Sequence, residues 1–234
     1  MSAVQPFDAT TALGDEAAGP DELERVPGAN GELVLRRRGP HHEIIANGVF
    51  LMDTSDGRSE RLLVTAAAAR MPERGRLLLG GLGVGFSLTA ALAEPRVREV
   101  HVVEVEPAVV RWNRGPLAVH HGDALADPRV TVHVADVADV LAEAEPGEFD
   151  AVCLDVDNGP DWVVVPANAR LYDPPGVAAA LRVLAPGGVL AFWSAHRADG
   201  LVGLLGEQLV DVEVREVPVP RGEPDVVVLG SVPA

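Results

Sequence analysis

The stretch that decides the fold is Leu77-Leu78-Leu79-Gly80-Gly81-Leu82-Gly83-Val84-Gly85. The apolar run predicts a buried strand, and the glycines after it predict a tight turn that opens a helix. Glycine lets the backbone approach a ligand, and a helix N-terminus offers free N–H groups. The spacing is G-x-G-x-G, with Phe86 where the dinucleotide fingerprint requires glycine, which favours an adenosyl cofactor over NAD. The candidate cofactor-binding residues of this turn are Gly80, Gly81, Gly83 and Gly85.

The next predicted strand, Val100–Val105, carries an acid near its end. Glu104 lies nineteen residues after Gly85. Nucleotide-binding sheets place an acid about twenty residues past the glycine turn, where it accepts hydrogen bonds from the ribose hydroxyls. Glu106 is the alternative, but strand alternation puts Glu104 at the carboxyl edge of the sheet. We therefore expect Glu104 to bind the ribose.

An acid also follows the third predicted strand, Val130–Val134. Asp136 lies where a carboxylate can accept a hydrogen bond from the adenine amino group, and the backbone N–H of Val137 can reach a ring nitrogen. An acid that opens a helix is also a common N-cap, and Asp136 can serve both purposes. Asp136 and Val137 complete the predicted cofactor site.

The fourth predicted strand, Ala151–Asp155, ends in two acids and a turn. Open α/β sheets bind ligands at this edge, so Asp155 and Asp157 are the candidate catalytic residues. A carboxylate there can act as a base and orient a nucleophile. The alternative is that both acids cap the loop that follows.

The remainder of the chain predicts an α/β domain over residues 58–234. The strand runs are apolar, which predicts a parallel sheet covered on both faces, closed by an antiparallel strand as in class I methyltransferase-like, Rossmann-type sheets. The other predicted elements are a helix over Arg61–Met71, strands over Arg76–Leu79 and Val189–Trp193, a helix from Pro174 to Pro186-Gly187-Gly188, and closing strands over Val212–Val217 and Val226–Leu229.

Two further segments precede this domain. Residues 1–30 are acidic, poor in apolar residues and without a sustained period, which predicts a disordered tail. Residues 31–57 predict a small β-hairpin appendage, because Asn47-Gly48 separates two apolar runs.

Composition narrows the classes of function. The chain has 234 residues and a net charge of −16, which argues against a nucleic-acid partner. The charge favours a cationic partner, and the alternative is that an acidic surface simply aids solubility. All nineteen basic residues are arginine, so a Schiff-base lysine and a Walker A loop are excluded. One cysteine, Cys153, cannot form an internal disulfide, and no apolar run is long enough to cross a membrane. The expectation is a cytoplasmic protein. The seven histidines show no metal-ligand spacing, so no metal is expected.

The order of these motifs resembles the spermidine synthase, or polyamine aminopropyltransferase, family. That family has a small N-terminal β-domain, a glycine-rich turn, a V-E-[ILV]-[DE]-P strand end, a D-P-R-V-x-[VL] approach to the third strand, an acid after it, a Y/F-D-x-[IV]-x-x-D strand end and an L-x-P-G-G segment. The matching residues here are Gly80–Gly85, Val103–Pro107, Asp127–Val132, Asp136, Phe149–Asp155 and Leu184–Gly188.

The resemblance implies a transferase that binds S-adenosylmethionine or its decarboxylated form as co-substrate. It would move an aminopropyl or methyl group to an amine-type acceptor, in polyamine biosynthesis. Glu104 would bind the ribose, Asp136 the adenine and Asp155 the attacking amine. The partner implied is a small cationic amine, and a homodimer is left open.

Three departures from the family pattern lie on the acceptor side. Gly83 stands where the family has an acid, Asp157 comes one residue early in the D-x-x-D-P loop, and Arg58-Ser59-Glu60 replaces Tyr-His-Glu. These departures keep open a second hypothesis, a non-catalytic protein that binds an adenosyl ligand. A nicotinamide oxidoreductase is a third, which the glycine spacing disfavours.

Overall fold

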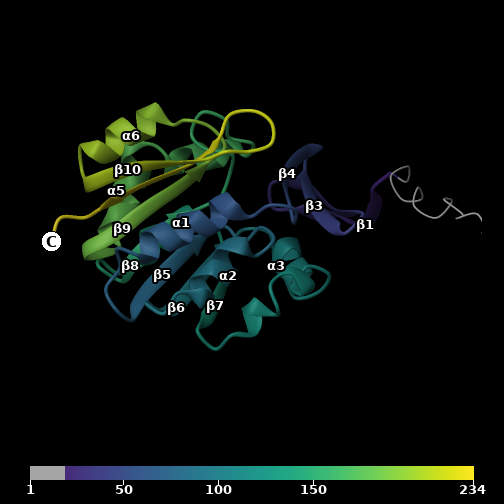
Figure 1. The fold of residues 1–234 in the computed structure, drawn as a ribbon, viewed down its shortest axis with the longest axis horizontal. Coiled ribbons are helices and arrows are strands. Elements are labelled where there is room, and N and C mark those ends of the chain that lie inside the picture. Colours follow the sequence, from purple (N-terminus) through teal and green to yellow (C-terminus); the bar gives the residue numbers. More distant parts are fainter. Residues whose placement is uncertain (1–18) are drawn as a thin grey trace, which may run out of the picture.

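The computed structural model describes residues 19–234, which form two sheets (Figure 1). A 4-stranded antiparallel sheet has the order β1-β2-β3-β4, and a 7-stranded sheet has the order β10-β11-β9-β8-β5-β6-β7. In Figure 1 the small sheet lies at one end of the molecule, and the C-terminus lies at the other. The strands of the small sheet are β1 (Asp21–Gly28), β2 (Gly31–Arg38), β3 (His41–Ala46) and β4 (Val49–Asp53).

The sequence predicted a disordered tail over residues 1–30, whereas part of this segment forms strand β1. It pairs antiparallel with β2, from Asp21 opposite Arg37 to Gly28 opposite Gly31. An edge strand is stabilised by backbone hydrogen bonds to its neighbour, so its low apolar content did not prevent pairing. The small sheet therefore begins at Asp21, and the rest of the expected tail, residues 1–18, lies outside the described residues.

The hairpin predicted at Asn47-Gly48 joins β3 to β4. Both turn residues have positive φ, 51° for Asn47 and 78° for Gly48, and Ala46 pairs with Val49 across the turn. A two-residue turn with positive φ at both positions matches the twist of the strands it connects. The prediction for this turn is confirmed.

The large sheet has parallel strands in its centre and on one side. Strands β8, β5, β6 and β7 follow one another in parallel, and β9 is parallel to β8, whereas β11 runs antiparallel to both β9 and β10. This is the expected class I methyltransferase-like sheet. Its strands are β5 (Gly75–Gly80), β6 (Val97–Glu104), β7 (Val130–Val134), β8 (Phe149–Leu154), β9 (Leu184–Ser194), β10 (Val210–Val217) and β11 (Asp225–Ser231).

Helices cover both faces of this sheet (Figure 1). Leu77 and Leu79 belong to the core cluster that includes residues of α1 and α2, and Leu78 belongs to the cluster that includes residues of α4, α5 and α6. Side chains alternate along a strand, so three consecutive leucines serve both cores. The helices are α1 (Arg58–Ala68), α2 (Phe86–Ala93), α3 (Pro107–Asn113), α4 (Val137–Glu143), α5 (Pro174–Arg182) and α6 (Asp199–Gly206), with short 3-10 turns at Ala118–His120, Ala124–Ala126 and Pro166–Leu171.

Several element boundaries differ from the predictions, and two helices show why. Helix α1 begins at Arg58, three residues earlier than expected, and ends at Ala68. Helix α5 ends at Arg182, and β9 already begins at Leu184 because Leu184 pairs with Phe149 of β8. Pairing with a neighbouring strand thus ends the helix before the Pro-Gly-Gly segment. Within residues 19–234, no helix is both long and apolar enough to cross a membrane.

Candidate active site

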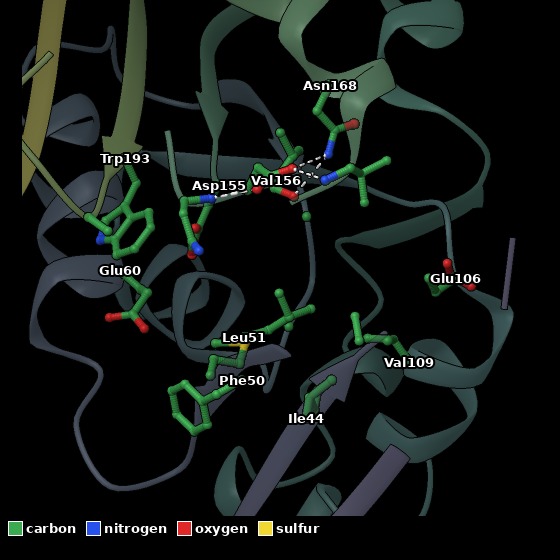
Figure 2. A pocket seen from close by; sticks show the side chains of 18 of the residues that line it. Ile44, Phe50, Leu51, Glu60, Glu106, Val109, Asp155, Val156, Asn168 and Trp193 are labelled. Carbon is green, nitrogen blue, oxygen red and sulfur yellow. Dashed lines mark hydrogen bonds between the residues drawn. The ribbon is translucent and has the colours of Figure 1, made fainter. Parts of the chain in front are cut away.

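A cavity of about 530 Å³ lies between the small sheet and the carboxyl edge of the large sheet (Figure 2). Leu33, Ile44 and Phe50 line it from the small sheet. The large domain contributes the glycine turn after β5 and the residues that follow β6, β7 and β8. Parallel strands bring their carboxyl ends to one edge, which is why motifs far apart in sequence meet here. The predicted site residues that line this cavity are Gly81, Gly83, Glu104, Asp136, Val137, Asp155 and Asp157.

The glycine turn requires glycine at two positions. Gly81 has φ of 98°, and a Cβ atom there would lie 2.0 Å from the backbone oxygen of Asp155. Gly85 has φ of 89° and forms the N-cap of α2. Gly80 ends β5 and packs against Leu154. The turn can therefore pass close to the acid after β8 and still open a helix.

Glu104 holds the glycine turn in place. Its carboxylate accepts hydrogen bonds from the backbone N–H of Leu82 at 3.0 Å and of Glu106 at 2.9 Å. Burial raises the pKa of Glu104, and these backbone hydrogen bonds oppose that change. A carboxylate offers about four lone-pair sites, so both oxygens can still accept from a ligand hydroxyl.

Glu106 has a different structural role. Its two carboxylate oxygens accept hydrogen bonds from the backbone N–H of Ala29 at 2.8 Å and of Asn30 at 3.2 Å. These residues form the turn between β1 and β2, so Glu106 joins the small sheet to the large domain at the cavity wall. The sequence predicted Glu104 as the ribose ligand, with Glu106 as the alternative; in the structure the Glu106 carboxylate is bonded to the small sheet.

Asp136 is the N-cap of α4, which is one of the two roles that the sequence predicted for it. Its carboxylate accepts from the backbone N–H of Ala138 at 2.9 Å. The other oxygen lies 2.7 Å from the guanidinium of Arg170. The side chain also lines the cavity, next to Val137. An adenine amino group would therefore share Asp136 with Arg170.

Asp155 follows β8 and lines the cavity beside Trp193 and Glu60 (Figure 2). Burial raises the pKa of its carboxyl to about 8, and the neighbouring carboxyls of Glu60 and Asp225 add to the effect. A carboxyl with this pKa can hold a proton near neutral pH and release it when a cation approaches.

Asp157 holds the loop after β8. Its carboxylate accepts from the backbone N–H of Val164 at 2.6 Å and of Val165 at 3.0 Å, and from the side-chain amide of Asn168 at 2.8 Å. This bonding is the loop-capping alternative raised for these acids. Asp157 thus fixes the loop that forms one wall of the cavity.

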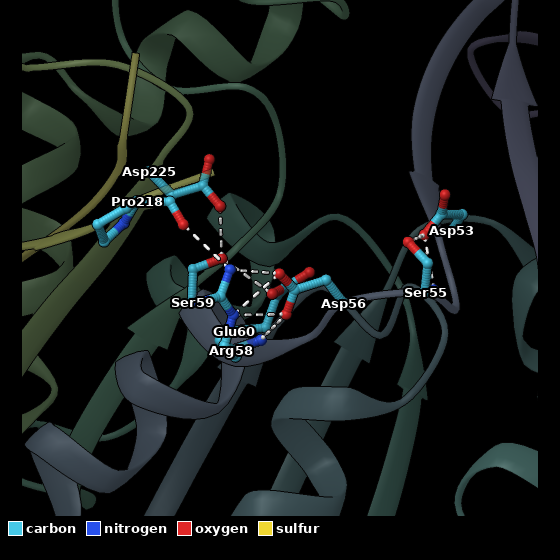
Figure 3. Close-up of polar contacts among 8 residues, drawn as sticks. All are labelled: Asp53, Ser55, Asp56, Arg58, Ser59, Glu60, Pro218 and Asp225. Carbon is cyan, nitrogen blue, oxygen red and sulfur yellow. Dashed lines mark hydrogen bonds and ion pairs between the residues drawn. The ribbon is translucent and has the colours of Figure 1, made fainter. Parts of the chain in front are cut away.

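The sequence did not single out Ser59, Glu60 and Asp225 as a site. The Ser59 hydroxyl lies 2.6 Å from Oδ2 of Asp225 and 3.0 Å from Oε2 of Glu60 (Figure 3). Ser59 and Glu60 begin α1, whereas Asp225 begins β11. Two features of the sequence could have pointed to this group. One is an acid in the first turn of the first helix, and the other is an acid directly ahead of an apolar strand.

All charged side chains that line the cavity within residues 19–234 are acidic. No arginine or histidine of this described part is among them, although the chain has nineteen arginines. Such a cavity attracts cations and repels carboxylates. Its ten acids are Glu32, Asp53, Asp56, Glu60, Glu104, Glu106, Asp136, Asp155, Asp157 and Asp225.

Aromatic side chains complete the lining. Phe50, Trp162 and Trp193 come from the small sheet, the loop after β8 and strand β9. The indole Nε1 of Trp193 is buried, and it has no hydrogen-bond partner among residues 19–234. Aromatic faces attract cations, so the aromatic and acidic parts of the lining favour the same class of ligand.

Two histidine pairs lie outside this cavity lining. Nδ1 of His42 lies 2.8 Å from Nε2 of His120, and Nδ1 of His101 lies 3.1 Å from Nε2 of His133. Across residues 19–234, no three His, Cys, Asp or Glu side chains are grouped so that they could hold a metal ion.

The chain is similar in sequence to proteins of known function. Over 161 residues the chain is 33% identical to a polyamine aminopropyltransferase of Mycobacterium tuberculosis (strain CDC 1551 / Oshkosh), covering 68% of this chain and 30% of that protein. Over 129 residues it is 29% identical to putrescine N-methyltransferase 3 of Nicotiana tabacum, covering 55% of this chain and 32% of that protein. The chain thus spans about a third of the length of these curated relatives.

The fold is shared with solved structures. A spermidine synthase in complex with the transition state analogue AdoDATO superposes with a TM-score of 0.78 at 15% sequence identity, covering 90% of this chain and 73% of that one. In addition, residues 59–197 match the family model described as the spermine/spermidine synthase domain. The glycine turn, Glu104, Asp136 and Asp155 all lie inside the matched span. The chain therefore belongs to the spermine/spermidine synthase domain family.

Proposed function

We propose that this chain transfers the aminopropyl group of decarboxylated S-adenosylmethionine to an amine acceptor, as a polyamine aminopropyltransferase does. The observation that carries the proposal is the uniformly acidic charge of the cavity lining. The decarboxylated donor bears a sulfonium and an ammonium group, both cationic. S-adenosylmethionine itself adds a carboxylate, for which the lining provides no cationic side chain within the described residues.

The nucleotide end of the donor would lie along the glycine turn. Glu104, already fixed by two backbone N–H groups, would accept hydrogen bonds from the ribose hydroxyls. Asp136 and the backbone N–H of Val137 would bind the adenine. Gly81 and Gly83 line the cavity, so the backbone of the glycine turn would lie against the ligand.

Asp155 would prepare the acceptor. The attacking nitrogen needs an unshared electron pair. It uses this pair to form a bond to the methylene carbon of the aminopropyl group that is bonded to the sulfonium. The carbon–sulfur bond breaks, its electrons stay on sulfur, and methylthioadenosine leaves as a neutral thioether. Asp155 orients the nitrogen and takes its proton, so no acid is needed for the leaving group. We assign Asp157 to positioning, since its oxygens are occupied by loop N–H and amide groups.

Methyl transfer is the second candidate, because relatives of similar coverage include a putrescine N-methyltransferase. The two reactions share the nucleotide site and the in-line attack on a carbon bound to sulfur. They differ in which carbon is attacked, and therefore in the mass added to the acceptor.

The test incubates the chain with an amine acceptor and each sulfonium donor in turn. Mass spectrometry of the amine then shows which group has been added to it. Aminopropyl addition from the decarboxylated donor is the expected result, and a methyl addition from S-adenosylmethionine would transfer the proposal to the second candidate. The variant Asp155→Asn tests the role of the base, because it keeps the shape of the side chain but cannot take a proton. We expect its rate to fall by about 10²–10⁴-fold with little change in methylthioadenosine affinity. Tight nucleotide binding without any product would instead indicate a non-catalytic adenosyl-binding protein.

A further inference from the structure

Asn113, the last residue of α3, is buried behind the glycine turn. Its side chain is 1% exposed and does not line the cavity. Its amide nitrogen Nδ2 donates to the backbone oxygen of Gly83 at 2.8 Å and to that of Val109 at 2.9 Å. An amide nitrogen carries two hydrogens, so both are used. Because two carbonyl oxygens face this nitrogen, a flipped amide would bring oxygen against oxygen, and the orientation of the side chain is determined by its contacts.

The bond to Gly83 reaches the part of the turn that faces the cavity. Gly83 lines the cavity and has φ of 53°, and a Cβ atom there would collide with the sulfur of Met52 from β4. Gly83 is therefore contacted by the small sheet on one side and by Asn113 on the other. Burial raises the pKa of Glu104, and backbone N–H groups, that of Gly83 among them, oppose this change. A shift of Gly83 would alter both the cavity wall and the surroundings of Glu104.

His121 packs beside Asn113 against the next glycine of the turn. A Cβ atom on Gly85 would lie 2.8 Å from Cδ2 of His121 and 3.2 Å from Oδ1 of Asn113. Both side chains thus lie on the side of Gly85 to which a Cβ atom would point. Nδ1 of His121 accepts from the backbone N–H of Ala124 at 3.1 Å, which places the proton of the neutral ring on Nε2. Burial lowers the pKa of His121, so the ring is neutral at about pH 7.

Two polar atoms of this pair are buried without a hydrogen-bond partner among residues 19–234. They are Oδ1 of Asn113, an acceptor, and Nε2 of His121, which carries the ring proton. Proteins seldom bury unpaired polar atoms, because each one costs free energy. An apolar side chain of the same shape at position 113 would pack without such an atom. Packing alone therefore does not account for the asparagine, whereas its bond to the carbonyl of Gly83 does.

We propose that Asn113 is a positioning residue of the nucleotide site. It binds the carbonyl of Gly83 from behind and so holds the glycine turn in the conformation that a nucleotide would contact, while His121 fills the space beside it. This role rests on the proposed function in one respect: the glycine turn and Glu104 are taken as the site of the nucleotide. It acts through the backbone of the turn and is independent of which group is transferred.

The test measures the affinity for methylthioadenosine by calorimetry in two variants of Asn113. Asn113→Leu has nearly the same shape but no donor, so it loses both bonds. Asn113→Thr loses only the bond to Gly83, because a helical threonine can donate to the carbonyl four residues earlier, which is that of Val109. We expect the Kd to rise by about five- to fiftyfold in both variants. Parent affinity in Asn113→Thr alone would overturn the proposal, since only the bond within α3 would then matter.

Hydrogen exchange of the backbone amides reports on the turn itself. Peptides that cover residues 80–86 should exchange faster in both variants without ligand, because the turn has lost a contact that holds it. The matched control is Val202→Ala, which removes an apolar contact in α6 on the other face of the sheet and does not line the cavity. It should lower the melting temperature and leave the Kd and the exchange of the turn unchanged. Equal weakening of binding in this control would overturn the proposal, since loss of stability would then explain the effect. If Asn113→Leu does not fold, Asn113→Thr carries the test.

The outcomes separate this role from the proposed function. Parent affinity in both variants would overturn the role of Asn113 and leave aminopropyl transfer untouched. Weaker nucleotide binding in both variants of a chain that forms no product would overturn the proposed transfer while the role of Asn113 stands. Where product forms, the KM of the sulfonium donor should rise by the same factor as the Kd, and kcat should change by less than about threefold. A fall confined to kcat would contradict a role in positioning the nucleotide site.

Discussion

At the scale of single residues, the surroundings of Asp155 set its chemistry. Its half-buried side chain follows β8 directly, with Glu60 and Asp225 close by, and desolvation raises the pKa of its carboxyl to about 8. A base whose pKa lies near neutral is well matched to taking a proton from an amine under physiological conditions. The same burial also links the protonation of Asp155 to the stability of the fold.

The first prediction concerns this linkage. The pKa of Asp155 is raised on folding, so the folded chain retains a proton that the unfolded chain loses above pH 3.8. Its stabilising contribution is complete below that pH and is lost as pH rises through about 8. Chemical denaturation from about pH 5 to about pH 9 should show the advantage of the parent chain over Asp155→Asn shrinking as pH rises. The histidine contributions are common to both chains and cancel. An advantage that is constant with pH would contradict the raised pKa.

The second prediction concerns Glu104. Glu104→Gln keeps the size of the side chain but replaces one accepting oxygen by an amide that cannot accept from Leu82 or Glu106. Loss of a hydrogen bond to a charged group costs about 1.5–3 kcal/mol, so methylthioadenosine affinity should fall roughly ten- to a hundredfold. Calorimetry provides the measurement. The control is Glu73→Gln, an exposed acid in the turn before β5, which should bind as the parent does. Parent-like affinity in Glu104→Gln would exclude Glu104 from the nucleotide site.

At the scale of elements, strand β1 attaches the small sheet to the large domain. Glu24 of β1 accepts a hydrogen bond from the indole of Trp112 at 2.6 Å, and Glu106 accepts from the turn that follows β1. Met52 of β4 lies against the glycine turn, since a Cβ atom on Gly83 would come within 2.4 Å of its sulfur. The small sheet is therefore one wall of the cavity.

The third prediction removes this strand. A chain that begins at Gly31 lacks β1 and the N–H groups that bind Glu106, whereas a chain that begins at Gly19 retains both. The shorter chain exposes the edge of β2 and removes both backbone hydrogen bonds to the Glu106 carboxylate, and a hydrogen bond to a charged group is typically worth about 1.5–3 kcal/mol. We expect a clearly lower melting temperature and weaker methylthioadenosine binding relative to the Gly19 chain. Equal melting temperatures would show that β1 contributes nothing to the fold.

At the scale of the whole molecule, charge favours one class of substrate. A net charge of −16 surrounds a cavity whose charged lining, within residues 19–234, is entirely acidic. Low-dielectric walls of one sign concentrate ions of the opposite sign in a cavity. A cationic amine and a cationic donor are both attracted by this field.

The fourth prediction follows from screening. Raising the ionic strength from about 0.05 M to about 0.5 M shortens the range of electrostatic attraction, so the KM for a polyamine acceptor should rise severalfold. The affinity for methylthioadenosine, which carries no net charge, should change little and provides the internal control. A KM that does not depend on salt would show that the acceptor is held by contacts other than charge.

Local patterns in the sequence determined the fold class and located the strand ends and turns at which the candidate nucleotide site lies. The glycine turn, the acid that ends β6, the acids after β7 and β8, and the Asn47-Gly48 hairpin are local signals, and the structure places each at the strand end or turn that its pattern indicated. Strand spacing and helix caps depend on neighbouring residues, which is why they can be read without a tertiary structure.

Only the tertiary structure decided which acids meet. Asp225 and Ser59 are 166 positions apart and come together because β11 inserts antiparallel between β9 and β10, which places its first residue beside α1. Strand β1 was hidden for the same reason: its stability comes from pairing with β2 and from Trp112, not from its own apolar residues. The contact of Glu106 with the turn between β1 and β2 likewise depended on where the small sheet docks. Local propensity fixes elements, but long-range packing fixes the partners of a charged side chain, because its free energy depends on the groups that surround it.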